Sequence, residues 1–291
     1  MWVPKKRLED MDVEGIDVAV LFGGGIGIGM SGFKDGKFAA AMMRAYDTWL
    51  QEFCSYNPKR LKGVMPVCLQ NPEETVAEMH RAVSEFGFVG LCIPPNAGGR
   101  NLYEKDFFPI YGEAEKLGVP LCIHMGGPFA PIDGAGLNRF NDRIYKHMVL
   151  HAFEQMIAFM TVLGGGILDV YPKSKVAFLE AGVGWVPYWL EKFEEHYEML
   201  GYQVPLMKSK PSEYLESGQV YISCECEEDT LEYVAEKIGD DKILYASDYW
   251  HWDGKFPGTV SAIADRPKLP EASKRKILGE NAKRFFGLNG T

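Results

Sequence analysis

Three residues whose side chains bind metals or transfer protons follow short apolar runs that lie far apart in the sequence. His124 follows VPLCI, Glu180 follows KVAFL, and Asp248 follows KILYAS. Each could be structural: a hydrogen-bonded histidine, a glutamate that caps the next helix, or an aspartate in an Asx turn. Imidazole and carboxylate groups are also the ligands of divalent metals, which polarise substrate oxygens and activate bound water. Because all three occupy equivalent positions, we favour a shared site over three coincidences.

The stretch LYASDYWHWDG adds aromatic and basic side chains directly after Asp248. His251 is a candidate for proton transfer together with Glu180. Trp250 and Trp252 flank His251, and we predict that they wall a pocket for a planar substrate. Packing is the usual role of a single tryptophan, so this prediction depends on their clustering.

Two further candidates for substrate contact are Trp185, which follows Glu180 closely, and His151, which lies in a helical pattern. The segment KHMVLHAFEQM places His147 and His151 four residues apart, on one face of a helix. Met148 stands where a zinc protease of the HExxH type needs a glutamate, so this segment does not indicate such a protease. His151 could still face the cavity.

The elements that must position these residues alternate between short apolar runs and amphipathic stretches. The alternation predicts βαβ units and a parallel sheet buried on both faces. In parallel barrels the side chains that follow the strands meet at one rim. The predicted strands are 17–22, 61–67, 89–93, 119–123, 175–179, 220–223 and 242–246, and the predicted helices are 5–14, 38–56, 72–86, 107–117, 145–171, 185–200 and 228–238.

The strand count is seven, whereas a closed (β/α) barrel has eight strands. The sequence therefore predicts a single α/β domain over 1–291, a (β/α)8 TIM barrel that lacks its first β/α unit. The two strand edges exposed by this gap would invite pairing with another chain, so we expect a homo-oligomer.

Composition excludes several classes of partner. The chain has 291 residues, a formal charge of −9 and a pI near 5.3, which argue against a nucleic-acid surface and against anionic membranes. No apolar run approaches the roughly 20 residues that span a bilayer, and the first residues lack the apolar stretch of a signal peptide. We expect a cytoplasmic protein that acts on a small molecule. The six cysteines are typical of buried, reduced thiols.

Several longer stretches resemble a known family. They are DMDVEGIDVAVLF, RLKGVMPV, GFVGLCIPP, GGGILDVYPKSKVAFLEAGVGWVPYWLEKFEEHYE, KILYASDYWHWDGKFPG and KILGENAKRFFGL. Together they resemble the amidohydrolase-related family of metal-dependent barrels, in the branch that contains aminocarboxymuconate semialdehyde decarboxylase. The resemblance implies one divalent metal, zinc with manganese as the alternative, held by His124 and Asp248.

The sequence departs from this family pattern at two places. It contains no HxH or ExH pair of the kind that the family carries on its first strand, and Glu180 stands where the decarboxylases place a histidine. The first departure agrees with the missing strand: the chain is a fragment, begins at an alternative start, or lacks these ligands. The function predicted is a metal-dependent hydrolase or decarboxylase of a small carboxylated or aromatic compound. The alternative is a catalytically inactive barrel that binds a small molecule or serves as an oligomer subunit.

Overall fold

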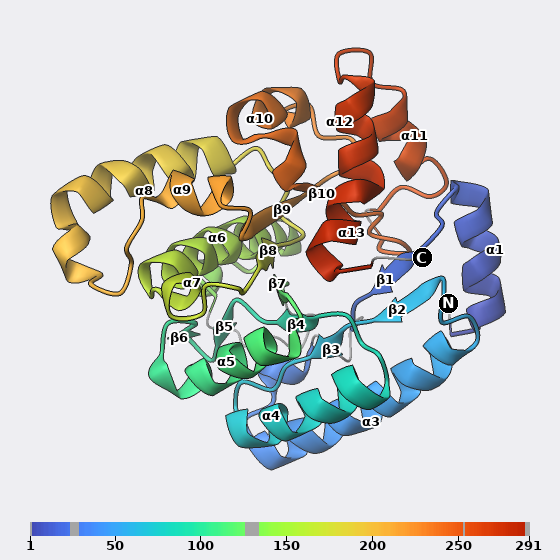
Figure 1. The fold of residues 1–291 in the computed structure, drawn as a ribbon, viewed down its shortest axis with the longest axis horizontal. Helices are drawn as coiled ribbons and strands as arrows, with labels where there is room; N and C mark the ends of the chain where they lie inside the picture. Colours follow the sequence, from blue (N-terminus) through green and yellow to red (C-terminus); the bar gives the residue numbers. More distant parts are fainter. Residues whose placement is uncertain (1, 24–28, 126–133, 253, 289–291) are drawn as a thin grey trace.

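A parallel β-sheet lies at the centre of the computed structural model, which describes residues 2–23, 29–125, 134–252 and 254–288 (Figure 1). Its hydrogen-bonded order is β10-β9-β8-β7-β4-β3, and β1 pairs in parallel with β2. Strands β2 and β3 form one run interrupted at Val64, whose N–H donates to the carbonyl of Leu21 in β1. The α/β fold with a parallel sheet is thus confirmed. The strands are β1 (Ala19–Leu21), β2 (Leu61–Gly63), β3 (Met65–Pro66), β4 (Leu91–Ile93), β7 (Leu121–Ile123), β8 (Val176–Phe178), β9 (Val220–Cys224) and β10 (Ile243–Tyr245), with a separate antiparallel hairpin of β5 (Asn96–Ala97) and β6 (Arg100–Asn101).

Helices connect successive strands and surround the sheet in Figure 1. Their ends follow local rules: Asp35 accepts hydrogen bonds from the N–H groups of Lys37 and Phe38 at the start of α3, and Gly118 ends α5 in the left-handed conformation. No helix among the described residues is long and apolar enough to cross a membrane. The α-helices are α1 (Pro4–Glu14), α3 (Gly36–Ser55), α4 (Pro72–His80), α5 (Phe108–Leu117), α6 (Arg143–Gly164), α7 (Ile167–Val170), α8 (Val186–Leu200), α9 (Pro211–Glu216), α10 (Leu231–Ile238), α11 (Thr259–Ala264), α12 (Glu271–Arg275) and α13 (Asn281–Phe286).

Single helical turns complete the architecture. Two π turns, η2 (Arg81–Glu85) and η7 (Lys276–Glu280), extend α4 and join α12 to α13. The helix predicted over 145–171 is divided at Gly164–Gly166 into α6 and α7, because Gly166 adopts a left-handed conformation with φ 67°. The 3-10 turns are η1 (Met30–Gly32), η3 (Lys105–Phe107), η4 (Leu137–Arg139), η5 (Gly201–Gln203) and η6 (Asp240–Lys242).

The two faces of the sheet carry separate hydrophobic clusters. Leu121 and Ile123 of β7 join the large cluster between the sheet and the helices, whereas Cys122 joins a small cluster on the other face. This alternation follows from the two-residue period of a strand. Phe285 of α13 belongs to the small cluster and lies 4.9 Å from the ring of Tyr221, so the last described helix packs on this inner face.

The free edges of the sheet lie at β1 and β10. Among the described residues no strand pairs with the outer edge of either. The part of the chain that the structure describes therefore contains no closed barrel. All six cysteines are free and five of them are buried, as predicted.

Candidate metal and active site

The side chains predicted to share a site follow strands of the sheet at its carboxyl end. His124 follows β7 directly, Glu180 follows β8, and Asp248 follows β10. Glu180 and Asp248 both have positive φ, 62° and 44°. Non-glycine residues in this region cost about 1–3 kcal/mol, and such strain concentrates at functional sites. The strand-end positions and the backbone strain mark this edge of the sheet as the candidate site.

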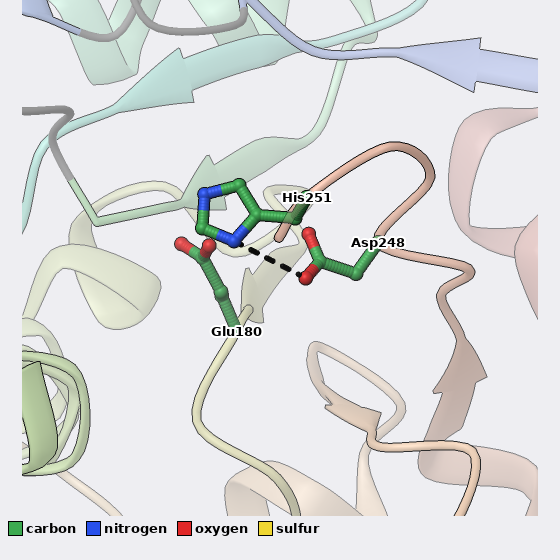
Figure 2. Close-up of side chains that lie close together, drawn as sticks. All are labelled: Glu180, Asp248 and His251. Carbon is green, nitrogen blue, oxygen red and sulfur yellow. Dashed lines mark ion pairs between the residues drawn. The ribbon is translucent and has the colours of Figure 1, made fainter. Parts of the chain in front are cut away.

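Glu180, Asp248 and His251 converge, although Glu180 comes from a different segment than the other two (Figure 2). One potential ligand atom from each lies within 4.8 Å of the others. His251 Nδ1 is 3.6 Å from Asp248 Oδ2. Two carboxylates and an imidazole at this spacing form a possible metal site. The cluster brings together Asp248, which was predicted as a metal ligand, and the two residues that were predicted to transfer protons.

Two further histidines lie beside the carboxylate of Glu180. Its Oε2 is 3.4 Å from Nδ1 of His124 and 3.7 Å from Nε2 of His151. Nδ1 of His124 also lies 2.9 Å from the carbonyl oxygen of Met125, and Nδ1 of His151 lies 3.0 Å from that of His147. Because a carbonyl only accepts, each Nδ1 carries the hydrogen. When such a ring is neutral, Nε2 is therefore the atom that can bind a metal or exchange a proton.

Hydrogen bonds from neighbouring strands and loops fix the segment that carries Glu180. The N–H of Glu180 donates to Ser223 Oγ at 3.0 Å, which ties it to β9. The carboxylate of Glu228 accepts from the N–H of Val183 at 2.9 Å and from that of Gly184 at 2.6 Å. The loop after β9 thus holds the loop after β8 in place.

Helix α6 is fixed to β7 by a single buried amide. Gln155 is fully buried, and its Nε2 donates to the carbonyl of Ile123 at 3.1 Å. His151 lies one helical turn before Gln155, so this bond sets the position of His151 beside Glu180.

Helix α1 fixes the loop that carries Asp248, and in Figure 1 it lies beside the C-terminal helices. The hydroxyl of Tyr249 donates to Asp10, and the guanidinium of Arg7 lies 4.2 Å from the centre of the Tyr249 ring. The bond from Tyr249 lowers the pKa of Asp10 more than burial raises it. The residue adjacent to Asp248 is thus anchored from outside the sheet.

A second bond from α1 holds the start of α11. The buried carboxylate of Glu14 accepts from the N–H groups of Gly258 and Val260, at 2.8 and 2.9 Å, and from the hydroxyl of Thr259. Burial raises the pKa of Glu14, but these hydrogen bonds outweigh it and lower the pKa below its usual value. Glu14 therefore supplies the cap that α11 needs at its N-terminus.

The predicted aromatic walls divide into two groups. Trp252 is 64% exposed and lies 5.4 Å from the ring of His147, and Trp250 is 60% exposed with φ 70°. Trp185 instead packs edge-on against Phe159 in the core, and its Nε1 donates to the carbonyl of Gly182. Packing accounts for the contacts of Trp185, whereas Trp252 lies beside the site histidines.

The residues that position the site were missing from the sequence prediction. Glu14, Gln155, Glu228 and Tyr249 act through partners that lie between 32 and 246 positions away, so no local spacing identifies them. The sequence offers a local sign for Glu228 alone. The glycine-rich turn AGVG exposes N–H groups that need an acceptor, and Glu228 supplies one.

The sequence matches the amidohydrolase family over residues 1–288, and the chain belongs to that family. It is 26% identical to 2-amino-3-carboxymuconate-6-semialdehyde decarboxylase of Dictyostelium discoideum, over 99% of this chain and 77% of that protein. It is 26% identical to gamma-resorcylate decarboxylase of Rhizobium radiobacter, over 98% and 87%. The 5-carboxyvanillate decarboxylase structure from Novosphingobium aromaticivorans, with manganese and 3-methoxy-4-hydroxy-5-nitrobenzoic acid bound, superposes with a TM-score of 0.81 at 26% identity, over 97% and 80%. The predicted resemblance and the prediction of an enzyme are confirmed.

Proposed function

We propose that this chain is a metal-dependent decarboxylase of small aromatic carboxylates. The observation that carries the proposal is the convergence of Glu180, Asp248 and His251 from two separate segments, at the end of the sheet where such barrels carry their sites. The activities of the relatives favour decarboxylation over hydrolysis. Nothing in the comparisons favours an inactive barrel.

The donor set fits a divalent metal with a preference for oxygen ligands. Glu180 and Asp248 would hold it together with His251. His124, predicted from the sequence as a ligand, lies beside Glu180 but outside this group of three. We propose manganese rather than the zinc predicted from sequence, because carboxylate-rich sites suit manganese and a related structure holds it. When bound, the metal supplies positive charge that binds a carboxylate and stabilises negative charge that develops next to it.

The chain's own residues would orient the substrate and deliver one proton. Decarboxylation breaks the bond between the ring carbon and the carboxylate carbon; the electron pair stays on the ring carbon, which takes a proton, and CO2 leaves. We assign this proton to Nε2 of His151, because the bond from Nδ1 to the carbonyl of His147 fixes the ring. Glu180 stabilises the protonated ring from 3.7 Å away. Trp252 covers the planar substrate.

Release of CO2 tests the proposed reaction. Protein loaded with manganese should release CO2 from 2,6-dihydroxybenzoate or 5-carboxyvanillate, the compounds named for related decarboxylases. His151→Gln should lower kcat by about 100-fold or more, because it removes a general acid. His196→Gln, at an exposed position on α8, is the matched control and should behave as wild type. Absence of CO2 from these acids and their analogues would refute the reaction, and an active His151→Gln variant would refute the assigned role.

The open edges of the sheet support two further parts of the proposal. We infer that the strands belong to a (β/α)8-type barrel in which the described residues leave one strand position unfilled, between β10 and β1. Exposed edges favour association, so we expect homo-oligomers in solution. Sedimentation that shows a stable monomer at micromolar concentration would count against association.

A further inference from the structure

A row of basic side chains leads from the candidate metal site along α6. Arg143, His147 and His151 are spaced at four residues, so their side chains lie on one face of the helix. His151 touches Glu180 at one end of the row, and the rings of His147 and His151 lie 4.3 Å apart. The row thus extends from the cluster for about two helical turns, or roughly 12 Å.

The ring of Trp252 lies against this row. Its ring lies 5.4 Å from that of His147 and 6.4 Å from that of His251, and the guanidinium carbon of Arg143 lies 4.5 Å from its centre. One tryptophan therefore touches both the loop of the metal cluster and the outer end of the row. A guanidinium stacked on an indole keeps its N–H donors free at the rim of the plane.

The charge of Arg143 is not matched by a carboxylate among the described residues. Its contact there is the ring of Trp252, whereas Arg100 and Lys192, for example, each pair with carboxylates. The chain as a whole is strongly acidic, and Glu180 and Asp248 add negative charge at the site. An anionic substrate therefore needs a cation to counter this repulsion, and Arg143 supplies one.

We propose that Arg143 and His147, backed by Trp252, form a second acid-binding subsite one to two helical turns outward from His151. The substrate class that fits is an aromatic compound with two acidic groups on opposite sides of the ring. One group lies at Glu180, Asp248 and His251, and the other accepts hydrogen bonds from Arg143 and His147. This inference rests on the proposed function, since it takes the cluster as the site of the reacting carboxylate.

Binding of two matched probes tests the subsite. Benzene-1,4-dicarboxylate and benzoate differ by one carboxylate, and calorimetry on protein loaded with manganese measures their affinities. We expect about a tenfold preference for the dicarboxylate, which is the effect of one charge-assisted hydrogen bond. Arg143→Ala should abolish the preference and leave manganese affinity unchanged, while Arg143→Lys should retain part of it.

Lys237→Ala is the matched control, because it removes a cation that also lies over an aromatic ring, that of Tyr233, but on α10 and outside the row. Equal affinity of the two probes for wild type, or an equal loss in Lys237→Ala and Arg143→Ala, would overturn the subsite. If manganese fails to bind, the proposed function fails separately. The subsite is then decided on the metal-free protein, where Arg143→Ala should weaken benzoate binding and an unchanged affinity would overturn it.

Discussion

The site has two walls that are built in different ways. The strand wall carries Glu180, His124 and His151, whose side chains are between 16% and 19% exposed. The loop wall carries Asp248 and His251, with side chains 37% and 44% exposed. The strand wall is held by neighbouring strands and loops, whereas the loop wall is held by α1 from outside the sheet.

This difference shows that the two halves of the proposed metal centre depend on unrelated parts of the fold. Substitutions of the residues that hold Glu180 should act on its position through the sheet. Changes in α1 should act on Asp248 through Tyr249 and Glu14. We expect the two routes to differ in the loss of manganese affinity that each causes.

Removing the charge of Glu228 should have the largest effect among the positioning residues. In Glu228→Gln the N–H groups of Val183 and Gly184 lose a charged acceptor, so the loop beyond Glu180 loosens. Substituting an outer partner of a ligand costs about 10- to 100-fold in metal affinity. A manganese titration measures this loss. Glu227→Gln, which removes an exposed partner of Lys255, should leave affinity unchanged, and equal behaviour of the two variants would contradict the role of Glu228.

Substituting Glu14 should affect stability and the loop wall together. Glu14→Gln should lower the free energy of unfolding by about 1–3 kcal/mol, because it removes a buried charged acceptor. Since the folded-state pKa of Glu14 is lowered, its contribution is present above its ordinary value of 4.5 and is lost as pH falls through the folded value. Denaturant unfolding followed from pH 6 down through pH 4.5 and below should show a flatter profile in the variant. We expect manganese affinity to fall less than about tenfold.

The exposed Glu9 provides the control for Glu14. Glu9→Gln lies on the same helix and removes a charge at 52% side-chain exposure. It should change neither the acid profile nor manganese binding. A loss like that of Glu14→Gln would show that the effect comes from the charge of α1 and not from the cap on α11.

The hydroxyl of Tyr249 should have a smaller effect. Tyr249→Phe removes the bond to Asp10 and keeps the ring on Arg7, so the free energy of unfolding should fall by about 1 kcal/mol. Manganese affinity should fall by less than in Glu14→Gln. Tyr233→Phe, at a 54% exposed position, is the control for loss of a hydroxyl. A larger loss of metal affinity in Tyr249→Phe than in Glu228→Gln would reverse the ranking of the two walls.

A buried carboxyl outside both walls should affect stability alone. Burial and the neighbouring Glu78 raise the pKa of Asp47 well above its ordinary value. Its stabilising protonation is therefore complete below pH 3.8 and is lost as pH rises through the folded pKa. Asp47→Asn should remove this decline in unfolding experiments toward neutral pH and leave manganese binding unchanged. A weaker manganese affinity would show that the core and the site are coupled.

Sequence patterns predicted the strand wall better than the loop wall. Apolar runs located the strands, and the rule that parallel strands end at one rim singled out His124 and Glu180. The anchors of Asp248 depend on contacts such as that between Glu14 and Val260, which join distant segments without a local signature. The short helices α11 and α13 were missed because they have too few turns to show an amphipathic period. Trp185 was assigned to the pocket from proximity in sequence, and its edge-on packing against the core residue Phe159 could not be derived from that proximity.

The central claim is that one divalent metal joins the two walls. Titration of the protein with manganese, followed by electron paramagnetic resonance of the free ion, measures stoichiometry and affinity directly. We predict one bound equivalent of manganese in wild type. Both Glu180→Gln and Asp248→Asn should lose more than about 100-fold in affinity, which is more than the loss expected when a residue that only supports a ligand is substituted. Wild type that binds no manganese, or an Asp248→Asn variant that binds it as tightly as wild type, would contradict the claim.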